Sequence, residues 1–141
     1  VGSELEPTLS WLKKTYPSHK WIKSDFSTNI KGNYDIIICA DVIEHLVDPD
    51  ILINFLKNIN FKYIFISTPE RDAIQKYQRG HTWMGPPNNP THMREWSFEE
   101  FKHYLGQHFN ITQHFMGQNN AEPIPLCQIV VINKINKTNK K

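Results

Sequence analysis

The sequence predicts an α/β domain whose mostly parallel sheet ends in a C-terminal antiparallel hairpin. Apolar runs typical of buried strands alternate with helical patterns along most of the chain. At the end, two strand patterns, "NITQHFM" and "LCQIVVINK", follow one another without a helix between them. The length of 141 residues suits one domain with one core. We therefore expect a domain over residues 1–133 and a flexible basic tail over 134–141.

Local patterns place the first elements. Pro7 suits the first turn of a helix in "LEPTLSWLKKTYP", and Pro17 ends it. "HKWIKSDF" is a short strand ending near Asp25. The continuous apolar run "YDIIICA" is typical of a strand buried on both faces. A helix begins at Asp48-Pro49, and its expected buried face consists of Ile51, Leu52, Phe55, Leu56 and Ile59.

The second half continues the alternation. "FKYIFIS" is a buried strand, and Ser97 with Glu100 forms a capping box that opens a helix with Phe98, Phe101, Leu105 and Phe109. The segment from Thr68 to Ser97 has four prolines and no clear periodicity. A connection of this length is usually a functional loop.

Composition limits the partners. With 16 basic and 14 acidic residues, the net charge of +2 predicts no phosphate-binding face, so no nucleic-acid partner is expected. Cys39 and Cys127 form no disulfide framework, which favours a cytoplasmic location. The chain contains no apolar run approaching the length of a membrane span, so no membrane partner is expected.

Acidic residues follow several predicted strands. In parallel α/β sheets, ligands bind at the carboxyl ends of strands, and an acid there can accept both hydroxyls of a ribose. This position makes Glu4 a candidate ribose ligand and Asp25 a candidate for an adenine amino group. Helix capping or turn formation explains both acids equally well.

A series of motifs resembles the class I S-adenosylmethionine-dependent methyltransferases. "YDIIICADVIEHLVDP" is similar to the fourth-strand motif of this family, and "FKYIFISTPE" resembles the fifth strand with its Thr-Pro turn. "NPTHMREWSFEEF" is similar to the substrate-side loop and the following helix, and the last two strands resemble the terminal strand pair. The resemblance covers nearly the whole chain in order and implies a Rossmann-like fold.

The resemblance also implies residue roles, with S-adenosylmethionine as the cofactor. Glu4 would hold its ribose, Asp25 and Phe26 would lie beside its adenine, and Ala40 and Asp41 beside its methionine portion. His45 or His92 would remove a proton from the acceptor. Glu44 would face the acceptor or cap the next helix. By residue type, Arg94 and the loop residues Trp83, Met84 and Trp96 suit contact with a ring-bearing or anionic acceptor, and packing of the loop explains them as well. Each histidine is equally well explained as a polar loop residue.

A divalent metal is an alternative for the same turn. Some methyltransferases that act on RNA 3′ ends or on polyprenyl catechol rings hold an ion with an acid-x-x-acid-His turn and a later histidine. Asp41, Glu44, His45 and His92 resemble that arrangement, with Asp41 where the pattern usually has Glu. The same turn also occurs in relatives without a metal, so the sequence assigns no metal ligand.

Three functions follow from these features. The leading one is methyl transfer to a small-molecule acceptor. The second is a non-catalytic remnant of the methyltransferase fold that does not bind the cofactor. The third, a metal-dependent hydrolase built on Asp41, His45, His81 and His92, lacks a dense histidine motif on a helix.

The Gly-rich turn of the family is missing. No G-x-G-x-x-G occurs, and "VGSE" falls at the end of the family's second strand, so the first strand and helix are expected to be absent. Their absence would leave strand edges unpaired and apolar faces uncovered. We therefore expect that these 141 residues do not form a self-sufficient monomer with normal cofactor affinity. The sheet would re-pair, a homodimer would form through the exposed surface, or the protein would extend upstream.

Overall fold

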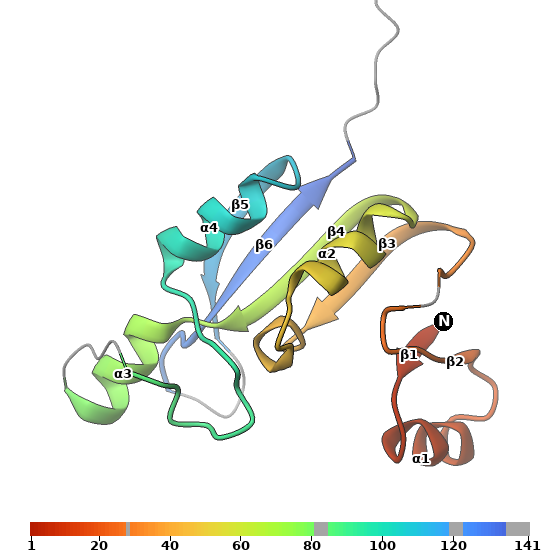
Figure 1. Cartoon of the computed structure of the whole chain (residues 1–141), viewed down its shortest axis with the longest axis horizontal. Helices are drawn as coiled ribbons and strands as arrows, with labels where there is room; N and C mark the ends of the chain where they lie inside the picture. Colours follow the sequence, from red (N-terminus) through yellow and green to blue (C-terminus); the bar gives the residue numbers. More distant parts are fainter. Residues whose placement is uncertain (28, 81–84, 119–122, 135–141) are drawn as a thin grey trace, which may run out of the picture. The chain divides into compact units, whose positions relative to one another are not determined.

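The chain forms two compact units, seen here in a computed structural model that describes residues 1–27, 29–80, 85–118 and 123–134 (Figure 1). The first unit comprises Val1–Gly32 and Asp50–Ile59. The second comprises Asn33–Pro49 and Asn60–Lys141.

The first unit contains a small parallel sheet and two helices. Its elements are β1 (Gly2–Glu4), α1 (Thr8–Thr15), β2 (Trp21–Lys23) and α2 (Asp50–Lys57). β1 and β2 pair in parallel, with Ser3 opposite Ile22. The helix α1 joins them and buries Leu9. The predicted elements are confirmed, although the strand expected over "HKWIKSDF" is only three residues long.

The buried face of α2 differs slightly from the sequence-based prediction. Leu52, Ile53 and Leu56 are each 1% exposed, whereas Ile51 is 45% exposed. On a helix of 3.6 residues per turn, Ile51 lies at the margin of the face on which Leu52 and Leu56 are centred. The sequence therefore predicts the apolar face of α2 correctly, except that it places the exposed Ile51 on that face because Ile51 belongs to a continuous apolar run.

The second unit is built on a four-stranded mixed sheet. Its strands, in spatial order, are β3 (Asn33–Ala40), β4 (Asn60–Pro69), β6 (Cys127–Asn133) and β5 (Ile111–Gly117). β3 and β4 are parallel, and β6 runs antiparallel to both β4 and β5. The predicted α/β fold with a C-terminal antiparallel strand pair is confirmed.

The two faces of this sheet differ in burial. On one face, Ile64 and Ile66 of β4 and Val130 of β6 are fully buried, as are Phe101 and Leu105 of α4 (Phe98–Gly106). On the other face, the expectation that "YDIIICA" is buried on both sides is wrong. Ile36 is 54% exposed and Ile38 is 74% exposed, and Tyr63, which pairs with Ile36 from the interior strand β4, is 43% exposed, so this face is uncovered around these residues.

The Thr68–Ser97 connection contains a helix that the sequence pattern did not predict. This helix, α3 (Arg71–Arg79), begins at Glu70, whose carboxylate accepts the Ala73 N–H at 2.6 Å, and ends at the left-handed Gly80. Only Gln75 of this helix is buried, so no apolar stripe marks it. The predicted capping box of Ser97 and Glu100 is confirmed at the start of α4.

The described helices are short. Within the residues that the structure describes, none combines the length and apolar character required to cross a bilayer.

Candidate active site

The carboxyl end of β3 leads into a one-turn 3-10 helix, η1 (Ile43–His45), that carries candidate residues. Asp41 joins the two in a left-handed conformation with φ of 51°. Its N–H donates to the Ser67 carbonyl at 3.2 Å, and its Oδ1 accepts the Ser67 hydroxyl at 3.0 Å. An aspartate tolerates this conformation better than most residues. The turn therefore directs the chain away from the sheet and is tied to the end of β4.

Glu44 is a buried acid on η1. It is 1% exposed, and its Oε2 accepts the hydroxyl of the buried Thr68 at 3.1 Å. Burial raises the pKa of Glu44 above its usual value, and the nearby charge of Asp41 acts in the same direction. The side chain expected to contact the acceptor is therefore enclosed, with Thr68 holding one of its oxygens.

Backbone contacts bring a distant segment to η1. The Glu44 carbonyl accepts the N–H groups of Met93 at 2.7 Å and Arg94 at 3.4 Å. His45 Nδ1 lies 3.0 Å from the Thr91 carbonyl and donates to it. These contacts span more than forty positions of the chain and place His92 beside His45.

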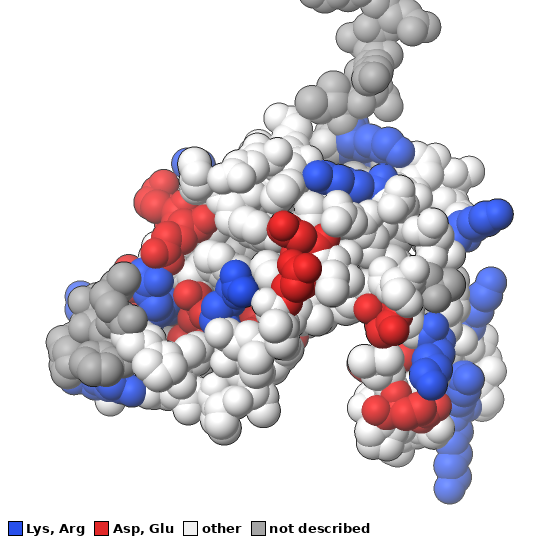
Figure 2. Space-filling model, viewed as in Figure 1, with Lys and Arg blue, Asp and Glu red and all other residues white. Residues whose placement is uncertain are grey.

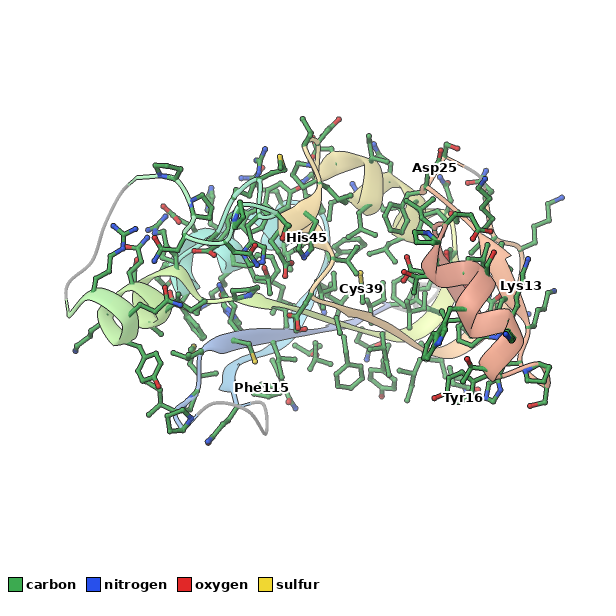
Figure 3. The ribbon with its side chains drawn as sticks, turned by 90° about the horizontal axis from the view of Figure 1, so that it is seen from below. Lys13, Tyr16, Asp25, Cys39, His45 and Phe115 are labelled. Atoms are coloured by element: carbon green, nitrogen blue, oxygen red, sulfur yellow. The ribbon has the colours of Figure 1, made fainter. Side chains whose placement is uncertain are left out.

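Three side chains converge at this point. The rings of His45 and His92 meet edge to face with centroids 4.8 Å apart, and His45 Nε2 lies 3.9 Å from Glu44 Oε1. One potential ligand atom from each of Glu44, His45 and His92 falls within 4.8 Å of the others. Asp41, the fourth member of the alternative metal set, is outside this group. His45 lies on the opposite side of the four-stranded sheet from Phe115 (Figure 3).

His92 is held on both ring nitrogens. Its Nδ1 lies 2.7 Å from Glu95 Oε1, and its Nε2 lies 3.0 Å from Asn89 Nδ2. The side chains of His92 and Glu95 are 10% and 4% exposed. His92 is thus a nearly buried imidazole in contact with a buried carboxylate.

Arg94, the other predicted acceptor contact, lies at the surface. Its Nη2 donates to the Val47 carbonyl at 3.0 Å, and its guanidinium lies 5.7 Å from the centre of the Trp96 ring. A guanidinium over an aromatic face is held with its charge still accessible. Its proposed role toward an anionic acceptor stays a prediction.

The candidate cofactor residues of the first unit have local contacts. Glu4 Oε1 accepts the N–H of Leu5 at 2.8 Å. Asp25 Oδ1 accepts the N–H of Ser27 at 3.0 Å, and the hydrogen bond from the Ser27 hydroxyl is the main cause of the lowered pKa of Asp25. Phe26 is left-handed, with φ of 69°, and its ring meets that of Phe55 at 5.3 Å. Their roles toward adenosine stay predictions.

Ala40 lies in the second unit and borders an apolar hollow of about 360 Å³. The hollow is lined by Ile36, Ile38, Cys39, Ala40, Phe65, Ser67 and Ile129. Cys39 is buried there, and burial raises the pKa of its thiol to about 12. The candidate cofactor residues are therefore divided between the two units, with Ala40 and Asp41 in the second.

Some candidates fall outside the described residues, namely His81 of the hydrolase alternative, Trp83 and Met84 of the expected acceptor loop, and the tail beyond Lys134. Among the residues visible on one face, acidic and basic side chains are interleaved (Figure 2).

The fold and the polar strand ends define a class of protein. Parallel strands followed by an antiparallel pair, with acids and histidines after a parallel strand, form the class I S-adenosylmethionine-dependent methyltransferase-like fold. Residues 6–113 match the model of a family described as a methyltransferase domain, so the chain belongs to this family. Membership supports methyl transfer as the general activity. No sequence among curated proteins matches the chain.

Solved structures agree with this assignment. The methyltransferase domain of bacterial Hen1 (CtHen1-CN) superposes with a TM-score of 0.67 at 19% identity, covering 94% of this chain and 76% of that one. Magnesium protoporphyrin IX methyltransferase from Synechocystis PCC 6803, with bound SAH, superposes with a TM-score of 0.65 at 16% sequence identity, covering 94% of this chain and 63% of that one. The small RNA methyltransferase HEN1 superposes with a TM-score of 0.51 at 23% sequence identity, covering 72% of this chain and 14% of that one. At these identities the similarities establish the fold.

These comparisons correct the predicted partners. A small-molecule acceptor was expected as the leading function, and the absence of nucleic acid was expected from the mild net charge. The structural relatives include Hen1 proteins, one of them described as a small RNA methyltransferase, which contradicts that expectation. Net charge summed over a whole chain does not report the chemistry of a local site, and this explains the error.

Three residues of the site escaped the sequence analysis: Thr68, Asn89 and Glu95. Each acts through a single contact with a candidate residue. Thr68 belongs to the recognised Thr-Pro turn, and Glu95 follows His92 by three positions. In a segment without regular periodicity, neither signal indicates which side chains meet.

Proposed function

We propose that this domain transfers a methyl group from S-adenosylmethionine to the 2′-hydroxyl of the 3′-terminal nucleotide of an RNA. The observation that carries the proposal is the convergence of Glu44, His45 and His92 within 4.8 Å. The family membership supports the reaction, and the bound SAH of one structural relative supports the cofactor. The Hen1 relatives support RNA as the acceptor.

A divalent cation fits the three converging side chains. One carboxylate and two imidazoles form a mixed oxygen and nitrogen donor set that suits Mn²⁺ and related ions. A cation would also offset the raised pKa of the buried Glu44 by favouring its ionised form. When bound, the ion would act as a Lewis acid toward the acceptor hydroxyl.

The protein's own residues would position the acceptor and receive its proton. The ring of His45 is 40% exposed, whereas that of His92 is 10% exposed. His45 is thus the more accessible of the two to an incoming hydroxyl, and its Nδ1–H is held by the Thr91 carbonyl. This leaves the lone pair on Nε2, which would accept the proton in the absence of an ion and would be a ligand instead when a cation is bound. Arg94 would contact a phosphate at the surface.

The resemblance to the family supplies the proposed cofactor residues. Glu4 is proposed for the ribose, Asp25 and Phe26 for the adenine, and Ala40 and Asp41 for the methionine portion. The sequence lacks a Gly-rich turn, so cofactor affinity is the first quantity to measure. Saturable binding of S-adenosylmethionine by calorimetry is expected. A folded sample without such binding would indicate the non-catalytic remnant instead.

The decisive experiment compares acceptors that differ by one atom. The protein is incubated with methyl-labelled S-adenosylmethionine, Mn²⁺ and a short RNA, or the same RNA with a 2′-deoxy nucleotide at its 3′ end. Label is expected in the first RNA alone. Equal labelling of both would refute the terminal 2′-hydroxyl as the acceptor, and labelling of neither, despite bound cofactor, would refute RNA.

A further inference from the structure

We infer that Glu95 and Asn89 are positioning residues that fix His92 in the tautomer with the proton on Nδ1, and so keep Nε2 unprotonated for a divalent cation. This inference rests on the proposed function for the identity of the ligand. The tautomer itself follows from contacts within the segment Asn89–Glu95.

The orientation of the Asn89 amide is determined by Thr91. The Asn89 Oδ1 accepts both the Thr91 N–H at 3.0 Å and the Thr91 hydroxyl at 2.8 Å. An oxygen in this position can only accept, so the other end of the amide is the NH₂ group. That nitrogen, Nδ2, lies 3.0 Å from His92 Nε2 and must donate to it.

The direction of this bond determines the proton on His92. A ring nitrogen that accepts a hydrogen bond carries a lone pair and no proton, so the proton of the neutral ring lies on Nδ1. Nδ1 faces Glu95 Oε1 at 2.7 Å, and an ionised carboxylate can only accept. Both partners of His92 therefore select the same tautomer, which is the less common one for free histidine.

His45 is preset in the same way by the same segment. Its Nδ1 donates to the Thr91 carbonyl at 3.0 Å, which leaves the lone pair on Nε2. The Thr91 carbonyl thus accepts a hydrogen bond from His45, while the Thr91 N–H and hydroxyl donate to Asn89. One short segment prepares the ligand nitrogens of both histidines.

A metal ion requires this preparation, because it binds the unprotonated nitrogen of a neutral imidazole. A carboxylate behind the ring fixes the tautomer and the ring orientation and makes the ligating nitrogen more basic. Glu95 is 4% exposed and in contact with His92, so it has the position of such a carboxylate. In the metal-free protein, the NH₂ of Asn89 occupies the nitrogen that the ion would take.

The test measures the tautomer and the metal affinity separately. The ¹⁵N shifts of His92 in the metal-free protein report which ring nitrogen carries the proton. The protein is expected to show Nδ1–H, and Glu95→Ala is expected to shift His92 toward the Nε2–H form. Calorimetric titration with Mn²⁺ is expected to show affinity lowered by about 10–100-fold in Glu95→Ala. Glu95→Gln keeps an acceptor oxygen and should retain more of both properties.

Glu99→Gln is the matched control, because it removes one exposed acid from the neighbouring helix without touching His92. It should change neither the tautomer nor the affinity. An Nε2–H tautomer in the unchanged protein would overturn the inference, as would a Glu95→Ala variant with unaltered tautomer and affinity. If the unchanged protein bound no Mn²⁺, the metal in the proposed function would be refuted, whereas the tautomer shifts would still decide the role of Glu95.

Discussion

The two groups of candidate residues in this protein differ in how they find their partners. Glu44 and the adjacent His45 converge within 4.8 Å with His92, which lies more than forty positions later in the sequence, and all three are wholly or partly enclosed. Glu4 and Asp25 are acids that hydrogen-bond to residues one and two positions away. Glu4 and Asp25 were selected from their positions at strand ends, whereas the other three were selected from the resemblance of a turn and a later loop to the methyltransferase family. The difference shows that long-range convergence, which costs chain entropy and desolvation, is the stronger sign of a functional site.

The largest expected effect removes one of the converging side chains. His92→Ala should lower Mn²⁺ affinity by at least roughly 100-fold, because an ion loses one of three protein donors. Asp25→Asn is the contrasting variant, and it should leave Mn²⁺ affinity unchanged while lowering the affinity for S-adenosylmethionine. Calorimetry with each ligand measures both. Equal effects of the two variants on Mn²⁺ affinity would contradict the proposed difference between the two groups of residues.

A stability measurement tests the hydrogen bond that Thr68 donates to the buried Glu44. Thr68→Val keeps the side-chain shape but removes the hydroxyl that donates to the buried carboxylate at 3.1 Å. The free energy of unfolding in urea should fall by about 1–3 kcal/mol, as is typical when a buried charged group loses its hydrogen bond. The exposed Thr15→Val serves as the control and should be nearly neutral. A neutral Thr68→Val would show that Glu44 is solvated.

The pH dependence of stability should have opposite signs for the two groups. The pKa of Glu44 is raised on folding, so its contribution to stability is present at acidic pH and is lost as pH rises through the folded-state pKa. The pKa of Asp25 is lowered, so its contribution is present at higher pH and is lost as pH falls. In EDTA, Glu44→Gln should therefore raise the Tm at pH 8 and leave it unchanged at pH 4. A higher Tm for Glu44→Gln at both pH values would contradict this assignment.

The smallest effect concerns Arg94, which lies at the surface near the converging group. Arg94→Ala should weaken binding of a short RNA by about 3–10-fold and reduce the salt dependence of binding, as expected when one phosphate contact is lost. Lys102→Ala removes an exposed charge from α4 and is the control. Filter binding at two salt concentrations gives both quantities. Identical salt slopes for Arg94→Ala and the unchanged protein would remove Arg94 from the acceptor site.

The sequence predicted the strands and most helices because burial leaves a periodic signal. "YDIIICA" and "FKYIFIS" became β3 and β4, and Ser97 with Glu100 capped α4 as expected. The helix α3 was missed because it buries only Gln75 and is stabilised by caps at Glu70 and Gly80. Ile36 and Ile38 were predicted to be buried, but an apolar run carries no information about whether a given face of the sheet is covered.

The sequence indicated which residues converge but not the contacts that hold them. Glu44, His45 and His92 were all named from the turn after a strand and from a later loop. The supporting roles of Thr68 and Glu95 depend on tertiary contacts that no local pattern encodes. The expectation of no nucleic-acid partner was wrong because overall charge was used to judge a local site.

The burial of Cys39 has a consequence for oxidation chemistry. Reaction with oxidants or alkylating agents requires the thiolate, and a thiol with a pKa of about 12 is almost entirely protonated at neutral pH. Cys127 is half-buried, and its pKa is also raised by burial. The protein therefore needs little protection by thiol reductants, which bind or reduce transition metals. Metal titrations can be performed in buffers free of such competitors.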